Sequence, residues 1–224
     1  TKLFPCLVDM RFKGVRVDLE HAAKLKKNLI VRENKILSKI KELTGIDVEI
    51  HAARSIAKAF DKLKLPYDRT EKSNEPSFTK NFLQNHPHEL AKSIADAREI
   101  NKAHTTFIDS ITKHSHDGRI HADINQIRSD QGGTVTGRFS MSNPNLQQIP
   151  ARHPEIGPMI RSIFIPEEKT VWGSFDYSQQ EPRILVHYAK LQNLEGVDEI
   201  VEAYNAGDAD FHQVVADMAG IERK

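Results

Sequence analysis

The residues best suited to chemistry lie in the run Phe-Asp-Tyr-Ser-Gln-Gln-Glu-Pro-Arg, residues 175–183. Asp176 follows a strand-like apolar stretch, and a helical pattern begins at Glu181. A carboxylate at such a junction is well placed to hold a divalent cation, because nearby backbone carbonyls can add further oxygen ligands. Asp176 could equally be a cap or turn residue, and Ser178 with Glu181 fits a helix capping box. From these residues alone, a metal ligand and a helix cap both remain open.

A second polar segment carries groups that could contact nucleic acid. It reads Thr-Gly-Arg-Phe-Ser over residues 136–140 and Pro-Asn-Leu-Gln-Gln-Ile-Pro over residues 144–150. Arg138 can bind a phosphate or a base edge through two parallel hydrogen bonds. The neutral donors and acceptors that could reach the minor groove are Asn145, Gln147 and Gln148. Taken alone, the segment also fits an Asn/Pro turn with a solvated arginine.

The first half of the chain, which must position these segments, is predicted to be mostly helical. Apolar residues recur at helical spacing from Leu25 to Leu43, with basic residues between them, so a long amphipathic helix should end near Gly45. A shorter helix is expected over residues 52–64 and a loop over residues 66–77. Another long helix should run from about His88 to Lys113.

The second half is predicted to mix strands with helices, which gives an α+β fold class. After the turn residues Asp117 and Gly118, alternation over residues 120–127 indicates a strand. Four prolines between residues 144 and 158 indicate a loop. The elements expected after it are strands over Arg161–Ile165 and Thr170–Phe175, a helix over Glu181–Leu191 and a last helix beginning near Asp210.

Composition limits the class of protein. A chain of 224 residues can form one large domain or two smaller ones, and its net charge of +1 means that any nucleic-acid surface must be local. The single cysteine, Cys6, excludes an intrachain disulfide, fits a reducing compartment and is expected to be a buried thiol. No stretch approaches the roughly 20 apolar residues that span a bilayer, so we expect a soluble protein without a membrane partner. Because the chain starts at Thr1 rather than Met and stops at Lys224 soon after a helix-like run, we expect a segment of a longer protein.

The pattern Asp-Tyr-Ser-Gln-x-Glu-x-Arg at residues 176–183 resembles motif A of the family A (DNA polymerase I-like) DNA polymerases. The resemblance implies that Asp176 binds both catalytic magnesium ions, that Tyr177 lends a backbone carbonyl, and that Glu181 excludes a ribose 2′-hydroxyl. Asp-Phe-His at residues 210–212 resembles the start of a fingers helix whose histidine lies near the incoming triphosphate. The substrate-binding residues implied in this way are Tyr177, Ser178, Gln179, Arg183 and His212.

The segments at residues 136–140 and 144–150 resemble a second signature of the same family, which meets the primer–template near the growing end. Arg161-x-x-Phe-x-Pro is similar to the strand just before motif A, and the segment from Met10 to Asp18 is similar to the one that leads into the thumb. Residues 98–106 resemble a thumb helix that faces duplex phosphates. The DNA-binding residues implied are Arg138, Asn145, Gln147, Gln148, Lys102 and Thr105. For the basic residues Lys24, Lys26 and Lys27, phosphate contact and plain solvation are equally open.

The resemblance implies a helical thumb over residues 1–118, part of a β-sheet palm over residues 119–195 and the start of the fingers helices over residues 196–224. The implied activity is template-directed addition of deoxynucleotides to a primer 3′-hydroxyl by two-metal phosphoryl transfer, with Mg²⁺ as cofactor. The implied partners are primer–template DNA, a deoxynucleoside triphosphate, and a C-terminal palm and fingers segment. That segment carries the family's second carboxylate and its triphosphate-binding Lys and Arg, motifs that this sequence lacks. We therefore expect this chain to be inactive alone.

Three other functions stay open. A non-catalytic module that binds primer–template DNA would be favoured if the gene ends near Lys224. A relative of the single-subunit RNA polymerases would share the palm, although Glu181 argues against it. A metal-dependent nuclease could use Asp176, with further acidic ligands available from Asp198, Glu199, Asp208 and Asp210. We expect a cytoplasmic or nucleoid-associated protein and hypothesise a phage-encoded origin.

Overall fold

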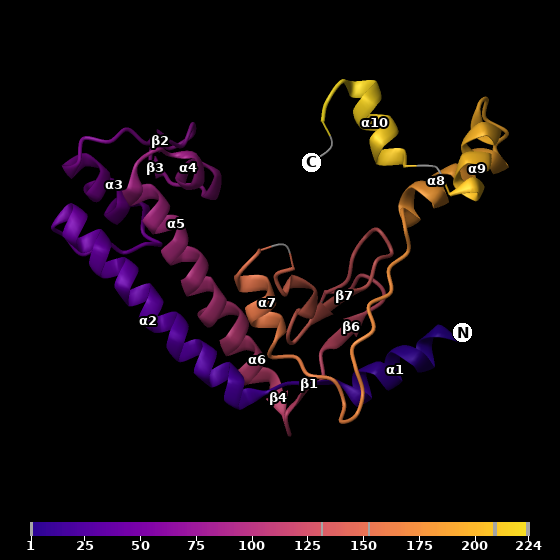
Figure 1. Cartoon of the computed structure of the whole chain (residues 1–224), viewed down its shortest axis with the longest axis horizontal. Coiled ribbons are helices and arrows are strands. Elements are labelled where there is room, and N and C mark those ends of the chain that lie inside the picture. Colours follow the sequence, from indigo (N-terminus) through magenta and orange to yellow (C-terminus); the bar gives the residue numbers. More distant parts are fainter. Residues whose placement is uncertain (1, 131, 152, 208–209, 223–224) are drawn as a thin grey trace. The chain divides into compact units, whose positions relative to one another are not determined.

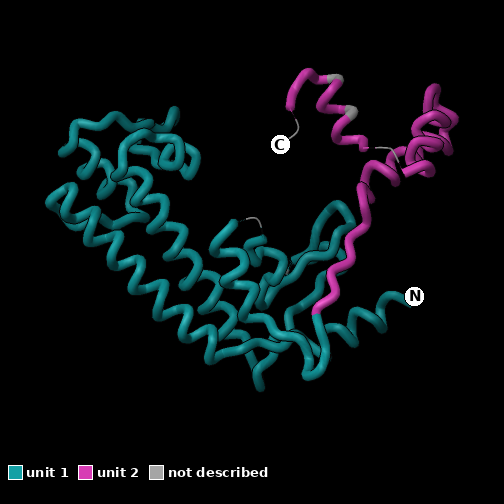
Figure 2. The backbone as a smooth tube through the Cα atoms, viewed as in Figure 1, with its two compact units in different colours: residues 1–171 teal, residues 172–224 magenta. Residues whose placement is uncertain are grey.

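The computed structural model describes residues 2–130, 132–151, 153–207 and 210–222 (Figure 1). They fall into two compact units, unit 1 over residues 1–171 and unit 2 over residues 172–224 (Figure 2). No helix in the described part of the chain is long and apolar enough to cross a bilayer.

Unit 1 combines helices with small antiparallel sheets. Its helices are α1 (Leu3–Lys13), α2 (Leu19–Thr44), α3 (Ala53–Lys62), α4 (Lys80–Asn85), α5 (Glu89–Lys102), the π-helical segment η1 (Ala103–Ile108), α6 (Asp109–His114), the 3₁₀ segment η2 (Leu146–Gln148) and α7 (Ile156–Arg161). One sheet has the order β1 (Val15–Arg16), β5 (Arg119–Ile120), β4 (Ser115–His116). The other two pair β2 (Asp68–Arg69) with β3 (Pro76–Ser77) and β6 (Asp123–Asn125) with β7 (Ser140–Ser142).

The long helix α2 begins and ends where local chemistry stops it. The Asp18 side chain accepts a hydrogen bond from the backbone N–H of His21 at 2.8 Å and so caps the first turn. At the other end Gly45 adopts the left-handed conformation, and its N–H donates to the carbonyl of Lys41. Helix α2 runs beside α5 (Figure 1). The predicted long helix ending near Gly45 is therefore confirmed.

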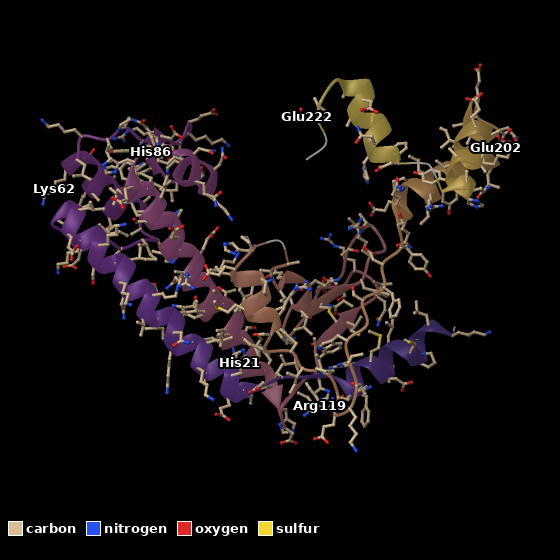
Figure 3. The ribbon with its side chains drawn as sticks, viewed as in Figure 1. His21, Lys62, His86, Arg119, Glu202 and Glu222 are labelled. Carbon is tan, nitrogen blue, oxygen red and sulfur yellow. The ribbon has the colours of Figure 1, made fainter. Side chains whose placement is uncertain are left out.

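Two hydrophobic clusters hold unit 1 together. The first is centred on Phe60, which is fully buried and contacts the rings of Tyr67, Phe78 and Phe82 at centroid distances of 6.2, 4.9 and 6.1 Å. The ring centroid of His86, a residue labelled in Figure 3, lies 5.5 Å from that of Phe60. The second cluster joins α2 to η1, α6, β5 and α7 through Leu29, Ile100, Ile108, Ile111, Ile120, Ile160 and Ile163.

Several sequence-based expectations for unit 1 are wrong in detail. The expected loop over residues 66–77 contains the short strands β2 and β3, and the expected strand over residues 120–127 is divided between β5 and β6. Cys6 is exposed rather than buried. The Asp117–Gly118 turn is confirmed: both residues have positive φ, at 48° and 72°, as a two-residue hairpin turn between β4 and β5 requires.

The two strands expected before motif A are absent from the described residues. Helix α7 occupies residues up to Arg161, and Pro158 fits within it because the first turn of a helix needs no N–H from that position. Beyond α7, Phe164 forms an isolated antiparallel bridge to Val17 rather than part of a strand. Residues Thr170–Phe175 belong to no β-ladder in the described part of the chain, so the strand expected there is not formed.

Unit 2 contains α8 (Gln180–Leu191), α9 (Val197–Ala206) and α10 (Phe211–Ala219). Its small core consists of Val186, Val197 and Tyr204, against which Ala189, Val201 and Phe211 pack. Asp210 caps α10 by accepting a hydrogen bond from the N–H of Gln213 at 3.2 Å, as the sequence predicts. The capping box of Ser178 and Glu181 is not formed, because α8 begins after Gln179 and has no side-chain cap. The mixture of helices with small sheets agrees with the predicted α+β class.

Candidate nucleic-acid and nucleotide sites

The β6–β7 hairpin frames the polar segment of unit 1. Its strands pair Asp123 with Ser142 and Asn125 with Ser140. The Asn125 amide donates to the hydroxyls of Ser140 and Ser142 at 3.4 and 3.2 Å, and the N–H of Gly133 donates to Ser140 at 3.1 Å. These side-chain bonds fix the two strand ends from which residues 133–139 extend.

The turn that carries Arg138 has a defined backbone. The Thr134 hydroxyl donates to the carbonyl of Arg138 at 2.7 Å, and the Arg138 side chain is exposed. Gly133 has a φ of 96°, and a Cβ there would lie 2.2 Å from the carbonyl oxygen of Ile127. Only glycine fits this close approach of two backbone segments. The guanidinium therefore extends from a turn whose path is set by its neighbours.

Gln147 and Asn145 make internal contacts that tie η2 to β7. The Gln147 amide donates to the carbonyl of Phe139 at 3.1 Å, while its oxygen accepts the N–H of Met141 at 3.2 Å. Asn145 caps η2 by accepting the N–H of Gln147 at 3.0 Å. Gln148 is exposed. The structure thus brings Asn145, Gln147 and the Arg138 turn together, with Gln147 engaged in holding the loop.

The residues predicted to face phosphates lie at the end of α5 and in η1. Lys102 and Thr105 are both exposed. The Lys102 ammonium lies 5.8 Å from the ring centroid of Phe107, and the Thr105 hydroxyl donates to the carbonyl of Asn101 at 2.8 Å. A cavity of about 70 Å³ lies between this helical segment and η2, lined by Phe107 and Gln148 among others. The helical and loop parts of the predicted DNA surface are therefore neighbours.

Basic residues of α2 are largely engaged in ion pairs. Lys24 binds Glu20 at 2.8 Å, and Lys26 binds Asp109 at 2.5 Å. Both pairs are solvent-exposed and contribute little stability, so phosphate contact by Lys24, Lys26 and Lys27 stays a prediction.

Charged contacts anchor α7, and with it the polar loop, to α2 and α5. Arg32 binds both carboxylate oxygens of Glu155, at 2.6 and 3.0 Å, and this hydrogen bonding lowers the pKa of Glu155. His153 Nδ1 accepts the N–H of Ile156 at 2.9 Å, so the proton must lie on Nε2, which contacts Glu99 at 3.0 Å. Burial acts to raise the pKa of Glu99, but hydrogen bonds from Lys80 and His153 lower it below its usual range.

In unit 2, the motif A residues lie just before α8 and in its first turn. Asp176 and Tyr177 are exposed. Glu181 is exposed in the first turn of α8, and Pro182 is accommodated in the same turn. The Arg183 Nε donates back to the carbonyl of Ser178 at 3.0 Å, which closes the turn before the helix.

Gln179 and Arg183 contact a residue that the sequence did not single out, Tyr204 of α9. The Gln179 side-chain oxygen accepts the hydroxyl of Tyr204 at 3.4 Å and the N–H of Phe211 at 2.9 Å. The Arg183 guanidinium lies 4.7 Å from the Tyr204 ring centroid. His212, the next residue of α10, is exposed. The only signal for Tyr204 in the sequence is its apolar spacing with Val197, which predicts burial but not a polar contact.

The donor set fits only part of a magnesium centre. Mg²⁺ prefers six oxygen ligands. Asp176 would supply a carboxylate oxygen and Tyr177 a backbone carbonyl oxygen, so further ligands would be needed. In residues 2–130, 132–151, 153–207 and 210–222, no group of three or more His, Cys, Asp or Glu side chains could hold a metal ion.

Two of the acidic residues that a nuclease could use, Asp198 and Asp210, have other contacts. Asp198 binds Lys190, and Asp210 caps α10. Asp208 lies outside the described residues. These contacts weaken the nuclease alternative.

The family model described as DNA polymerase family A matches residues 19–222, which include both motif segments. A DNA-directed DNA polymerase of Pseudomonas phage M6 is 36% identical over 242 aligned residues, covering 100% of this chain and 36% of that protein. The thermostable DNA polymerase I of Thermus aquaticus is 32% identical over 225 residues, covering 97% of this chain and 26% of that enzyme.

A solved structure described as the POL domain of Pol1 from M. smegmatis in complex with DNA primer-template and dNTP has a TM-score of 0.73 to this chain. It is 27% identical, and the match covers 96% of this chain and 37% of that one. The fold is thus similar to that of a polymerase domain. The chain belongs to the family A DNA polymerases, and it spans 36% and 26% of the lengths of the two relatives above.

Proposed function

We propose that this chain is the thumb and the N-terminal part of the palm of a template-directed DNA polymerase. Residues 1–118 would form the thumb, residues 119–195 the partial palm and residues 196–224 the start of the fingers. The observation that supports this most strongly is the family match over residues 19–222, a range that includes both motif segments. A phage origin is part of the proposal, supported by the four phage DNA polymerases that are 32–36% identical to the chain.

Unit 1 would bind the primer–template. Arg138 supplies a bidentate cation from a fixed turn, while Asn145 and Gln148 offer neutral groups to the minor groove. Gln147 would contribute mainly by holding the loop, because both ends of its amide already bind backbone. Lys102 and Thr105 would contact phosphates, which fix the position of the duplex without reading its sequence.

Unit 2 would bind the nucleotide and the metal. The Asp176 carboxylate and the Tyr177 carbonyl would be magnesium ligands, and bound Mg²⁺ would neutralise charge on the triphosphate. Glu181 would exclude a 2′-hydroxyl by occupying the space beside the sugar. Ser178 and His212 would contact the nucleotide. Gln179 and Arg183, also predicted to bind substrate, make intramolecular contacts that suit a supporting role.

Catalysis would need a C-terminal palm and fingers segment to complete the carboxylate set. The exposed apolar surface of unit 2 supports this. Trp172 is 61% exposed and Phe175 is 97% exposed, and Leu185 and Tyr188 of α8 are also exposed. Covering a large apolar side chain stabilises a protein by roughly 1.5–3 kcal/mol, so a further segment packed here would gain substantially.

Primer extension by the product of the complete open reading frame tests the proposal. With Mg²⁺, we expect the Asp176→Asn variant to lose extension by at least about 100-fold, as for removal of an essential charged group. Asp198→Asn is the matched control, because it removes an exposed carboxylate that pairs with Lys190, and it should extend primers like the wild type. An Asp176→Asn variant as active as the wild type would exclude the metal role.

The second candidate is a non-catalytic module that binds primer–template DNA, which the incomplete carboxylate set favours. It predicts that the complete protein binds DNA but that neither the wild type nor the Asp176→Asn variant extends a primer. Replacing Glu181 with Ala separates the polymerase from a relative of the RNA polymerases, because the proposed gate predicts increased ribonucleotide incorporation.

A further inference from the structure

We infer that Gln179 and Tyr204 are positioning residues that hold the start of α10, and therefore His212, against the start of α8. The inference deepens the proposed function and rests on it only for the effect on nucleotide binding. It assigns to Gln179 a role distinct from direct substrate contact, and it adds Tyr204 to the set of functional residues.

The Gln179 oxygen joins two elements that follow it by 25 and 32 residues. It accepts the hydroxyl of Tyr204 at 3.4 Å and the backbone N–H of Phe211 at 2.9 Å. Phe211 is the first residue of α10, and the first N–H groups of a helix have no partner within it. Asp210 satisfies the N–H of Gln213, so Gln179 provides a second acceptor for the same helix end.

The chemistry fixes which end of the amide faces Phe211. A backbone N–H can only donate, so the side-chain oxygen of Gln179 must be the atom that meets it. Tyr204 is 6% exposed, and a buried hydroxyl requires a partner. Gln179 itself has a φ of 52°, a left-handed backbone that side chains rarely adopt. These contacts explain why a glutamine remains in that conformation.

Arg183 of α8 also contacts Tyr204 and the turn that carries Gln179. Its guanidinium lies over the Tyr204 ring at 4.7 Å, while its Nε binds the carbonyl of Ser178 at 3.0 Å. Phe211 packs against the small core that contains Tyr204. The turn before α8, the α9 ring and the start of α10 are therefore linked through one buried tyrosine and one amide oxygen.

Gln179 and His212 would therefore have different roles in nucleotide binding. Gln179 would act on the nucleotide through Phe211 and His212, without touching it. Loss of the amide oxygen would release the start of α10 and weaken nucleotide binding, while the DNA-facing residues of unit 1 would be unaffected. Tyr204→Phe would remove only the hydroxyl and should give a smaller effect in the same direction.

Amide hydrogen exchange of Phe211, measured by NMR on this chain, tests the contact without any activity. Gln179→Leu removes the acceptor, and we expect exchange to become about tenfold faster, as for the loss of one hydrogen bond. Gln179→Glu keeps acceptor oxygens and should preserve the wild-type rate. Gln180→Leu is the control, because it makes the same change at the exposed neighbour. Unchanged exchange in Gln179→Leu would overturn the inference. Should that variant not fold, Gln179→Asn takes its place, because its shorter side chain withdraws the amide oxygen from Phe211, and unchanged exchange there would overturn the inference equally.

Steady-state extension by the complete protein tests the consequence. We expect Gln179→Leu to raise the KM for the deoxynucleotide about three- to tenfold with little change in kcat or in DNA affinity. Combined with His212→Ala, its effect should be far less than additive, since both variants would remove the same contact. Additive effects would overturn the positioning role. If the wild-type protein extends no primer, the proposed function fails, and the exchange rates alone decide whether Gln179 holds α10.

Discussion

Replacing Glu33 with Ala should strongly destabilise unit 1, because this carboxylate is buried between α2 and η1. Glu33 and His104 are 8% and 7% exposed, and their Oε2 and Nε2 atoms lie 2.5 Å apart. The Asn101 amide donates to the other oxygen of Glu33 at 2.8 Å. His104 Nδ1 has no partner in the described part of the chain, so the ring cannot compensate through its second nitrogen.

The magnitude follows from the groups left behind. Glu33→Ala would leave two polar groups, on His104 and Asn101, without their acceptor. Each buried polar group left without its partner costs about 1–3 kcal/mol, and two such groups remain here. We therefore expect the free energy of unfolding to fall by about 3–5 kcal/mol. Replacing both Glu33 and His104 with apolar residues, Glu33→Met with His104→Leu, should recover the part of this loss that comes from His104, because only the partly buried Asn101 amide then lacks its acceptor.

Urea unfolding followed by far-UV circular dichroism measures this loss. Fluorescence of Trp172 is unsuitable, because Trp172 belongs to unit 2. Glu20→Ala is the control, since it removes an exposed carboxylate of the same helix and should have little effect. If Glu33→Ala unfolds within about 1 kcal/mol of the wild type, or if the double variant is as unstable as the single one, the reasoning is refuted. The expected loss of stability would also show that Glu33 of α2 anchors the segment that carries Lys102 and Thr105, through Asn101 and His104.

Three further predictions concern unit 1. Hydrogen bonding by Arg32 lowers the pKa of Glu155, so the folded state binds the carboxyl proton of Glu155 more weakly than the unfolded state does. The Arg32–Glu155 pair therefore stabilises the fold above the ordinary carboxyl pKa, and this stabilisation is lost as pH falls through the lowered pKa. Urea titrations from neutral to about pH 3 should therefore show a smaller loss of stability in Arg32→Ala than in the wild type. Gly133→Ala should weaken primer–template binding without loss of helical signal, because its Cβ would lie 2.2 Å from the carbonyl oxygen of Ile127. Lys102→Ala should reduce the slope of log K against log salt by about 1 in fluorescence anisotropy, as for one lost phosphate contact, whereas an unchanged slope would exclude that contact.

The elements that could be predicted from sequence are those whose limits are set by local chemistry. Gly45 ends α2 because only its left-handed backbone turns the chain there, and Asp210 begins α10 because its carboxylate reaches the N–H of Gln213. The Asp117–Gly118 hairpin has the same local origin. The motif segments could also be recognised before the structure, and the family match confirms the resemblance on which they depend.

The wrong predictions concern features that depend on distant partners. The apolar stretch at Thr170–Phe175 fits a strand, but a strand needs a neighbouring strand, and no β-pairing among the described residues includes this stretch. Arg161 lies at the end of helix α7 rather than at the start of a strand. This helix can contain Pro158 because proline is tolerated in a first turn, which periodicity alone does not show. Neither the π-helical turn at His104 nor the contact of Gln179 with Tyr204 follows from spacing, since each depends on residues far away in the sequence.

The two units therefore differ in what their own contacts can stabilise. Unit 1 has two clusters of buried side chains and a polar loop tied to backbone by Gln147, so the residues that we propose to contact DNA should keep their arrangement in this chain. Among the described residues of unit 2, the hydrophobic cluster is small, with Val186, Val197 and Tyr204 buried in it, and Phe175 next to Asp176 is almost fully exposed. Local opening is easiest where few apolar contacts hold a segment, so amide exchange should be slow in α2 and α5 and fast around Asp176. DNA binding is thus a property to measure on the chain itself, whereas the chemistry assigned to Asp176 requires the complete protein.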